Sequence, residues 1–176
     1  SQGLHAKLKL AERYGFHMLA DGHLGFEGKH FAQSMKEMID DDCASGVVVI
    51  LDTLKKFANV MDKGDSSSFA RLVRRFVLKG GTVVALAHTN KNRGSDGQPI
   101  FGGTSDIVDD FDCAYTIAVV PKAQGVDQRV VEFKNIKLRG GVEEIASYSY
   151  SLERGLSYAE ILQSVREVDP LELSPM

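Results

Sequence analysis

The sequence predicts an α/β fold, in which a largely parallel sheet is flanked by helices and antiparallel strands follow at its carboxyl-terminal edge. Two apolar runs, residues 47–52 and 82–88, carry the first half of this prediction, and one amphipathic segment separates them. Strands that are apolar on both faces are typical of buried parallel sheets. Alternating patterns over residues 129–138 and 146–152 predict the antiparallel part.

The composition fits one globular domain over residues 1–168, followed by a loose tail at residues 169–176. The chain has 176 residues, of which 43% are hydrophobic and 26% charged, and its formal net charge is only -3. This charge argues against a strongly basic nucleic-acid module, although a local basic patch stays open. Cys43 and Cys113 are too few for a disulfide framework, so we expect reduced thiols in or near the core of a cytoplasmic protein. No apolar run approaches the roughly 18 residues of a membrane span, and no signal peptide is recognisable.

Apolar periodicity predicts the elements ahead of the first buried strand. Residues 3–14 have helical spacing and end at Gly15, because glycine favours a helix stop. The apolar run over residues 16–20 predicts a short strand. A second helix is indicated by the apolar residues of one face: Phe31, Met35, Met38 and Ile39.

Between the two buried strands, the sequence predicts a loop and then a helix. Residues 63–68 are small and polar and include helix-capping types. The helix behind them ends at Gly80–Gly81, and its arginines are expected to face outward. Its inner face is marked by a strong apolar stripe: Phe69, Leu72, Val73, Phe76 and Val77.

The last third of the chain changes character. Residues 113–120 predict a strand and residues 121–127 a turn. Ser157 and Glu160 have the spacing of a capping box, which opens a final helix reaching about Val168.

Polar residues stand where both buried strands end, and ligands bind at the carboxyl ends of open parallel sheets. Asp52 and Thr53 end the first strand, and His88 and Asn90 end the second. A carboxylate in this place is suited to hold Mg²⁺, usually through water, beside nucleotide phosphates. A histidine there is suited to donate a hydrogen bond to a phosphate oxygen. The alternative for each residue is an ordinary capping or strand-end role.

Residues 90–103 are polar and rich in glycine, and they lack any periodicity, as functional or disordered loops do. The stretch carries Lys91, Arg93 and Phe101. Basic groups beside an aromatic ring are suited to single-stranded nucleic acid, since phosphates are neutralised and a base can stack. An ordinary surface loop is the alternative.

Four aspartates follow this loop: Asp106, Asp109, Asp110 and Asp112. They could hold a cation, but their spacing matches no EF-hand loop. A short helix capped near Ser105 is the favoured interpretation.

Lys137 and Arg139 precede Gly140–Gly141 at the end of a predicted strand. Such a pair could reach a phosphate, including one bound to a neighbouring subunit, as an arginine finger does. The alternative is a charged hairpin tip.

The segment Gly22–His30 looks like a phosphate loop, but it is rejected. The Walker A pattern needs four residues between its glycines and a Ser or Thr after its Lys. Here five residues separate Gly22 from Gly28, and His30 follows Lys29.

In this order, the motifs resemble those of the RecA-like ATPases, and most of all the hexameric replicative helicases of plasmids and phages. The resemblance covers about residues 4–155. Residues 47–53 are similar to the Walker B strand, and residues 82–90 to the strand whose terminal His or Gln senses the γ-phosphate. Residues 90–103 fall where the family has a DNA-contacting loop. Lys137-Leu138-Arg139 resembles the Lys-x-Arg finger that acts on the adjacent subunit's ATP.

The resemblance implies an ATP- and Mg²⁺-dependent DNA motor of DNA replication, which works as a cytoplasmic homo-oligomer of the hexameric type. It implies that Asp52 binds Mg²⁺ and that His88 senses the γ-phosphate. It also implies that Lys137 and Arg139 act in catalysis on the ATP of the adjacent subunit. The remaining roles are nucleotide contacts by Thr53 and Asn90, and contacts to single-stranded DNA by Lys91, Arg93 and Phe101.

The family's Walker A loop and catalytic Glu precede the Walker B strand, and this sequence shows neither. We therefore expect an amino-terminally truncated RecA-like domain that has half a nucleotide site and binds ATP weakly or not at all. The alternative is a non-catalytic RecA-fold binding or assembly module. A third reading, a hydrolase using Asp52 and His88, lacks a recognisable nucleophile.

Overall fold

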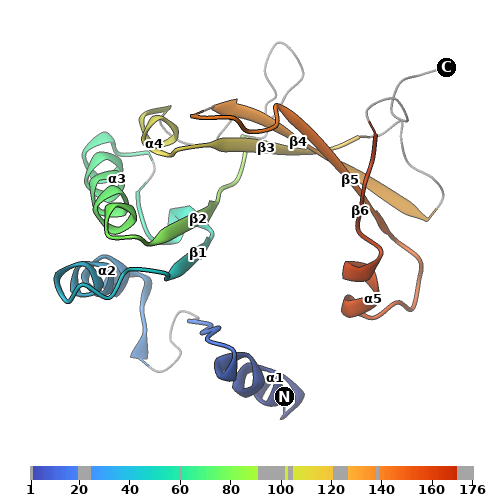
Figure 1. The fold of residues 1–176 in the computed structure, drawn as a ribbon, viewed down its shortest axis with the longest axis horizontal. Coiled ribbons are helices and arrows are strands. Elements are labelled where there is room, and N and C mark those ends of the chain that lie inside the picture. The colour runs from blue at the N-terminus through green and yellow to red at the C-terminus, as the bar shows by residue number, and fades with distance from the viewer. Residues whose placement is uncertain are drawn as a thin grey trace.

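The computed structural model describes residues 2–19, 25–59, 61–90, 102, 105–120, 127–137 and 139–169. They form a mixed α/β fold with two separate sheets, a parallel pair and an antiparallel sheet of four strands (Figure 1). The predicted combination of parallel and antiparallel strands is therefore present. Among the described residues, however, the parallel part is only one pair, so a largely parallel sheet stays a prediction.

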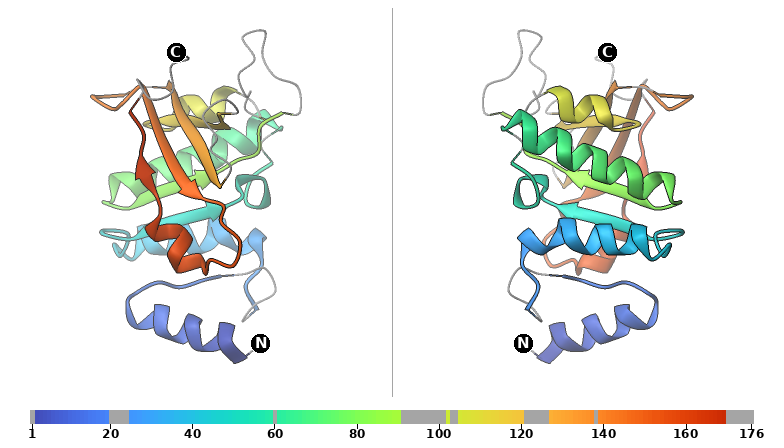
Figure 2. Two further views of the ribbon diagram at one scale, coloured as in Figure 1. Left: turned by 90° about the vertical axis from the view of Figure 1, so that its right-hand side faces the viewer. Right: turned by 90° about the vertical axis from the view of Figure 1, so that its left-hand side faces the viewer.

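The core lies on one face of the parallel pair. Strands β1 (Val48–Asp52) and β2 (Thr82–Leu86) run side by side in the same direction, and Asp52 lies opposite Leu86. Helices α2 (Phe31–Asp40) and α3 (Lys63–Leu78) cover this face next to each other (Figure 2). Both predicted apolar stripes point inward, and the core consists mainly of these buried side chains: Phe31, Met35, Ile39, Leu51, Leu54, Phe69, Leu72, Val73 and Phe76.

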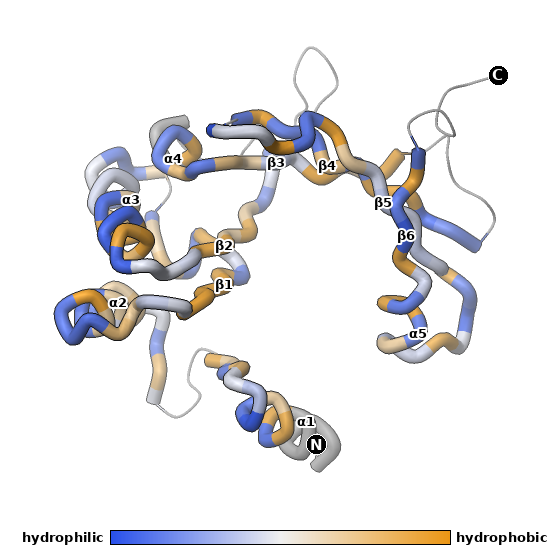
Figure 3. Tube along the Cα trace, in the orientation of Figure 1, coloured by the Kyte–Doolittle hydropathy of each residue, from blue (hydrophilic) through white to orange (hydrophobic). Residues whose placement is uncertain are grey.

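The other face of the parallel pair is not covered by any described residue. Its apolar side chains are strongly exposed, with Val48 at 60%, Ile50 at 58%, Val84 at 45% and Leu86 at 44%. Figure 3 shows the apolar character of both strands. Because parallel sheets are normally buried on both faces, this side is a surface at which further structure is expected to pack.

Helix α3 begins earlier than the sequence predicted. Residues 63–68 were expected to be a loop, but they form its first turns. The reason is Asp62, whose side chain accepts a hydrogen bond from the backbone N–H of Asp65 at 2.8 Å and so caps the helix. Ser66 is fully buried, and its hydroxyl donates to the Asn59 carbonyl oxygen at 3.3 Å.

The amino ends of β1 and β2 are tied together by the chain segments that lead into them. The Gly46 N–H donates to the Gly80 carbonyl oxygen at 3.0 Å. The Lys79 ammonium binds the Asp42 carboxylate at 2.7 Å, and this hydrogen bond and charge lower the pKa of Asp42.

The second sheet is an antiparallel meander in chain order. Its strands are β3 (Ala114–Val119), β4 (Gln128–Lys137), β5 (Ile145–Ser151) and β6 (Arg166–Glu167). The strands predicted in this region are confirmed, and so is the short helix before them, α4 (Ser105–Asp110). In β5 the buried side chains are serines, since Ser147 and Ser149 are buried while Tyr148 between them and Tyr150 after them are half-buried.

The predicted capping box opens helix α5 (Tyr158–Gln163). The Ser157 N–H donates to the Glu160 carboxylate at 2.7 Å, and the Glu160 N–H donates to Ser157 Oγ at 3.3 Å. These bonds lower the pKa of Glu160. The helix ends at Gln163 rather than near Val168, because the chain turns back to pair β6 with β5 and the Val168 N–H donates to the Ser147 carbonyl oxygen at 2.9 Å.

Two further predictions are corrected. Residues 16–19 follow α1 (Gln2–Arg13) without forming a strand, and no described strand lies along them to supply hydrogen bonds. Cys43 and Cys113 are free, as expected, but both are exposed rather than in the core. Two short 3₁₀ turns are also present. The first, η2 (Gly28–His30), precedes α2, and the second, η3 (Leu54–Lys56), follows β1.

None of the helices in the described part of the chain has the length and apolarity needed to cross a bilayer. Residues 121–126 of the predicted turn and residues 170–176 of the predicted tail lie outside the described residues.

Candidate functional site

The parallel register brings two of the predicted site residues to one edge of the sheet. Because Asp52 lies opposite Leu86 in a parallel pair, the chain that follows β2 continues past the same edge, with His88 two residues on. The expectation that Asp52 and His88 stand at neighbouring carboxyl ends follows directly from this register.

Asp52 presents its carboxylate to solvent at the end of β1. Its side chain is exposed and makes no hydrogen bond or ion pair with the described residues, whereas its main-chain oxygen accepts from Lys56 Nζ at 3.0 Å. The peptide bond between Asp52 and Thr53 is cis. The carboxylate is thus available to an external ligand, and the chain beside it is held by Lys56.

Thr53 carries the clearest sign of a missing partner. Its hydroxyl oxygen Oγ1 is buried and has no hydrogen-bond partner among the described residues. A buried hydroxyl without a partner is costly, and native proteins normally satisfy it with protein, water or ligand. A polar ligand group at the end of β1 would satisfy it.

A hollow of ≈ 230 Å³ opens beside these strand ends. Apolar side chains form much of its wall, and three polar groups, Lys55, Asn59 and His88, stand among them. The other lining residues are Leu54, Ala58, Met61, Ala87 and Gly102. Lys55 and Asn59 were not singled out from the sequence, because nothing in their local pattern distinguishes them from other polar residues after a strand.

Gly102 packs against the chain segment that directly follows β2. Its N–H donates to the His88 carbonyl oxygen at 3.2 Å. A Cβ at this position would lie 2.9 Å from that same oxygen and 3.3 Å from Asn90 Oδ1. The backbone therefore needs a glycine here, and Gly102 supports the segment that carries His88 and Asn90.

Replacing Gly102 by Ala is expected to displace this segment and to lower the free energy of unfolding by about 1–3 kcal/mol, as overpacking does. Urea unfolding measures the loss, and the imidazole NMR signals of His88 should shift. Gly141→Ala is the matched control, since a Cβ there meets nothing within 4 Å. Equal effects of the two substitutions would contradict the close approach.

Comparisons with protein-family models, with curated proteins and with solved structures gave no match for this chain. Its site is therefore interpreted from its own residues.

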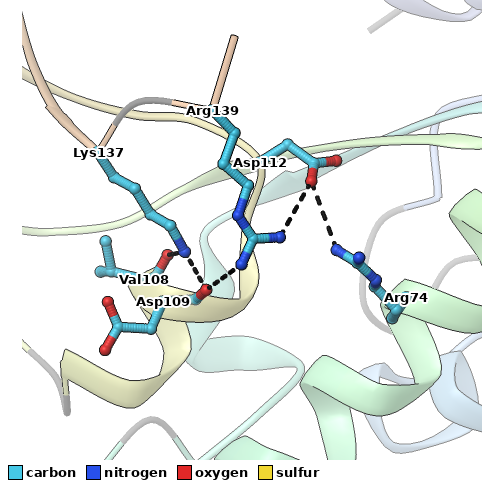
Figure 4. Close-up of polar contacts among 6 residues, drawn as sticks. All are labelled: Arg74, Val108, Asp109, Asp112, Lys137 and Arg139. Atoms are coloured by element: carbon cyan, nitrogen blue, oxygen red, sulfur yellow. Dashed lines mark hydrogen bonds and ion pairs between the residues drawn. The ribbon is translucent and has the colours of Figure 1, made fainter.

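Lys137 and Arg139 do not join Asp52 and His88 through any described contact. They lie at the end of β4 and reach onto the carboxyl end of α4 (Figure 4). Asp112, just after α4, lies 3.6 Å from Arg139 Nη1 and 3.5 Å from Arg74 Nη1. Sequence reasoning placed Arg74 on an outward face and grouped Asp112 with possible cation ligands, so it missed this pairing.

The metal prediction rests on Asp52 alone. Within the described residues, no three His, Cys, Asp or Glu side chains gather closely enough to hold a metal ion. Lys91, Arg93 and Phe101, which were predicted to contact nucleic acid, lie outside the described residues.

Proposed function

We propose that this chain is the carboxyl-terminal part of a RecA-like, ATP-dependent DNA motor of the replicative helicase type, acting in DNA replication. The observation that supports this most directly is the parallel β1–β2 register. It puts an exposed carboxylate, a histidine and the unpartnered hydroxyl of Thr53 at one sheet edge. Carboxylate and hydroxyl oxygens suit Mg²⁺ beside phosphates, and an imidazole N–H can donate a hydrogen bond to a phosphate oxygen.

The residues present fit one wall of a nucleotide site. Asp52 would hold Mg²⁺ through water, with Thr53 and Asn90 as further polar contacts, and His88 would donate to the γ-phosphate. Bound Mg²⁺ would supply charge neutralisation of the phosphates. The sequence contains no Gly-x-x-x-x-Gly-Lys-Ser/Thr, so in the proposed motor the backbone cradle and its lysine would be supplied by another segment of the complete protein.

The uncovered face of the parallel pair supports the same proposal. The exposed side chains of Val48, Ile50, Val84 and Leu86 form an apolar surface that a complete α/β sheet would bury. In the complete motor, the strand that carries the phosphate loop would pair at an edge of this sheet, and a helix would cover the exposed face.

In the proposed assembly, Lys137 and Arg139 act on ATP held by the neighbouring subunit of a cytoplasmic, hexameric homo-oligomer. Lys91, Arg93 and Phe101 contact single-stranded DNA, where phosphates and stacked bases suit their chemistry.

The double substitution Lys91→Ala and Arg93→Ala is therefore expected to weaken the binding of single-stranded DNA by the complete motor. Unchanged binding would contradict the proposed DNA contact of these residues.

The isolated 176-residue chain is expected to bind Mg-ATP weakly or not at all, because only one wall of the site is present. Isothermal titration calorimetry measures this, and micromolar affinity would contradict the half-site. The coding sequence ahead of Ser1 gives the decisive check. A Walker A pattern in the segment that precedes Ser1 supports the motor, and its absence supports the alternative below.

The alternative is a non-catalytic RecA-fold binding or assembly module. One observation favours it: Lys137 and Arg139 are both engaged with α4 of their own chain rather than standing ready for a partner. This module would keep the fold without ATP turnover.

A further inference from the structure

The amino-terminal arm of the chain, residues 2–19, lies apart from the rest of the described structure (Figures 1 and 2). It consists of α1 and the extended residues behind it, and no described helix or strand packs extensively against α1. The turn at the end of the helix closes within the arm, since the N–H groups of Tyr14 and Phe16 donate to the Ala11 carbonyl oxygen at 2.9 and 3.1 Å. The arm is therefore a separate element with its own local structure.

The arm presents apolar side chains to solvent. Half or more of the surface of each of these residues is exposed: Leu10 at 54%, Tyr14 at 84%, Phe16 at 50%, Met18 at 54% and Leu19 at 57%. Single exposed apolar residues are common, but a run of five large ones along one short segment marks a surface that binds another surface. The arm therefore has an apolar side that nothing described covers.

The uncovered face of the parallel pair matches this arm in size. Helix α1 has 12 residues and so is about 18 Å long, while β1 and β2 have five residues each and span about 17 Å. A helix with its side chains is about 10 Å across, which is enough to cover two strands that lie about 4.8 Å apart. One helix of this length therefore suffices to bury the exposed side chains of the face: Val48, Ile50, Val84 and Leu86.

The charges of the two surfaces are also complementary. The sequence of α1 contains three basic residues, Lys7, Lys9 and Arg13, against the single acidic residue Glu12, although the whole chain has a net charge of -3. The exposed acidic run at residues 40–42 leads into the amino end of β1. Opposite charges beside two apolar faces steer their encounter and fix their orientation.

We propose that the amino-terminal arm docks on the uncovered β1–β2 face of a second copy of this chain, so that two copies exchange their arms. Each copy offers one open arm and one open face, and the arm stands away from its own body. Reciprocal exchange covers both arms and both faces and leaves neither open, as a closed two-fold contact does. The inference goes beyond the proposed function and does not depend on ATP.

Sedimentation equilibrium of the 176-residue chain over a concentration series tests this proposal. The expected result is a reversible dimer whose dissociation constant rises about tenfold with Leu10→Gln and with Ile50→Thr, because each removes apolar surface from the contact. Glutamine keeps a high helix propensity, and threonine keeps the β-branched shape. The mass of a single chain at all concentrations would overturn the proposal.

Leu78→Gln is the matched control, since Leu78 is 76% exposed at the end of α3 and belongs to neither surface. Its dissociation constant should equal that of the unchanged chain. An equal rise for Leu78→Gln and Leu10→Gln would show nonspecific association and would overturn the proposal. Thermal unfolding of each variant checks that these exposed substitutions leave the chain folded.

Crosslinking decides which copy the arm covers. With Cys43 and Cys113 replaced by serine, a Leu10→Cys chain is mixed with an Ile50→Cys chain and treated with a short bismaleimide. A crosslinked pair of different chains is expected, and a Leu78→Cys chain in place of Ile50→Cys should give far less. Crosslinks found only within single chains that carry both cysteines would overturn the exchange, because the arm would then cover its own sheet.

The outcome is separable from that of the proposed motor, because these measurements use this chain alone and no nucleotide. A complete protein without a phosphate loop would refute the motor and leave the arm exchange standing. A chain that stays single would refute the exchange and leave the nucleotide site untouched.

Discussion

If the proposed complete motor exists, Asp52→Asn in it is expected to lower ATP turnover by about 10²–10³-fold, as removal of one preorganised charge-stabilising group does. The substitution keeps the shape of the side chain and removes the charge at the end of β1. The fold should be unaffected, since the Asp52 side chain is exposed and bonds to no described residue. Steady-state ATPase assays measure the loss, and thermal unfolding shows that stability is retained.

Asp41→Asn is the control for this prediction. Asp41 is also exposed and follows α2 directly, so it lies toward the amino end of β1, opposite Asp52. The ATP turnover of Asp41→Asn should match that of the wild-type protein.

Mixing Asp52→Asn subunits with Arg139→Ala subunits should restore part of the activity, because some interfaces then combine an intact Asp52 with an intact Arg139. Full turnover by Asp52→Asn would reject its role.

The parts of the fold that could be predicted are those that local chemistry determines. The β1–β2 pair was predictable because residues 47–52 and 82–88 are apolar on both faces, a pattern that few other structures tolerate. The capping box at Ser157 was predictable because both of its hydrogen bonds join residues three apart. The inner faces of α2 and α3 were predictable for the same reason, because the apolar stripe of each helix lies within a short stretch of sequence.

What could not be predicted depends on neighbours distant in the chain. Residues 16–19 are apolar enough for a strand but have no described strand beside them. The interaction of Arg139 with Asp109 joins residues 30 positions apart. No short motif could show that Lys137 and Arg139 donate to carbonyl oxygens of α4. The start of α3 was misjudged for a different reason, because the cap at Asp62 outweighs the low helix propensity of the residues behind it.

Phe76→Ala is expected to lower the free energy of unfolding by about 3–5 kcal/mol, the usual cost of a fully buried aromatic ring. Phe76 has no exposed surface, and it belongs to the buried apolar cluster formed by α2, α3 and the parallel pair. Urea unfolding measures the change. Leu78→Ala, on the same helix, is the matched control, because Leu78 is 76% exposed and should lose no more than about 0.5 kcal/mol.

Gly81 offers an independent check on the position of this ring. A Cβ at Gly81 would collide with the Phe76 ring, so Gly81→Ala should be destabilising in the wild-type background. With Phe76→Ala already present, the space is open and the same substitution should cost much less. The coupling energy of this double-mutant cycle therefore reports the contact itself. Purely additive losses would show that the ring does not lie against Gly81, and that the turn from α3 into β2 is held by other contacts.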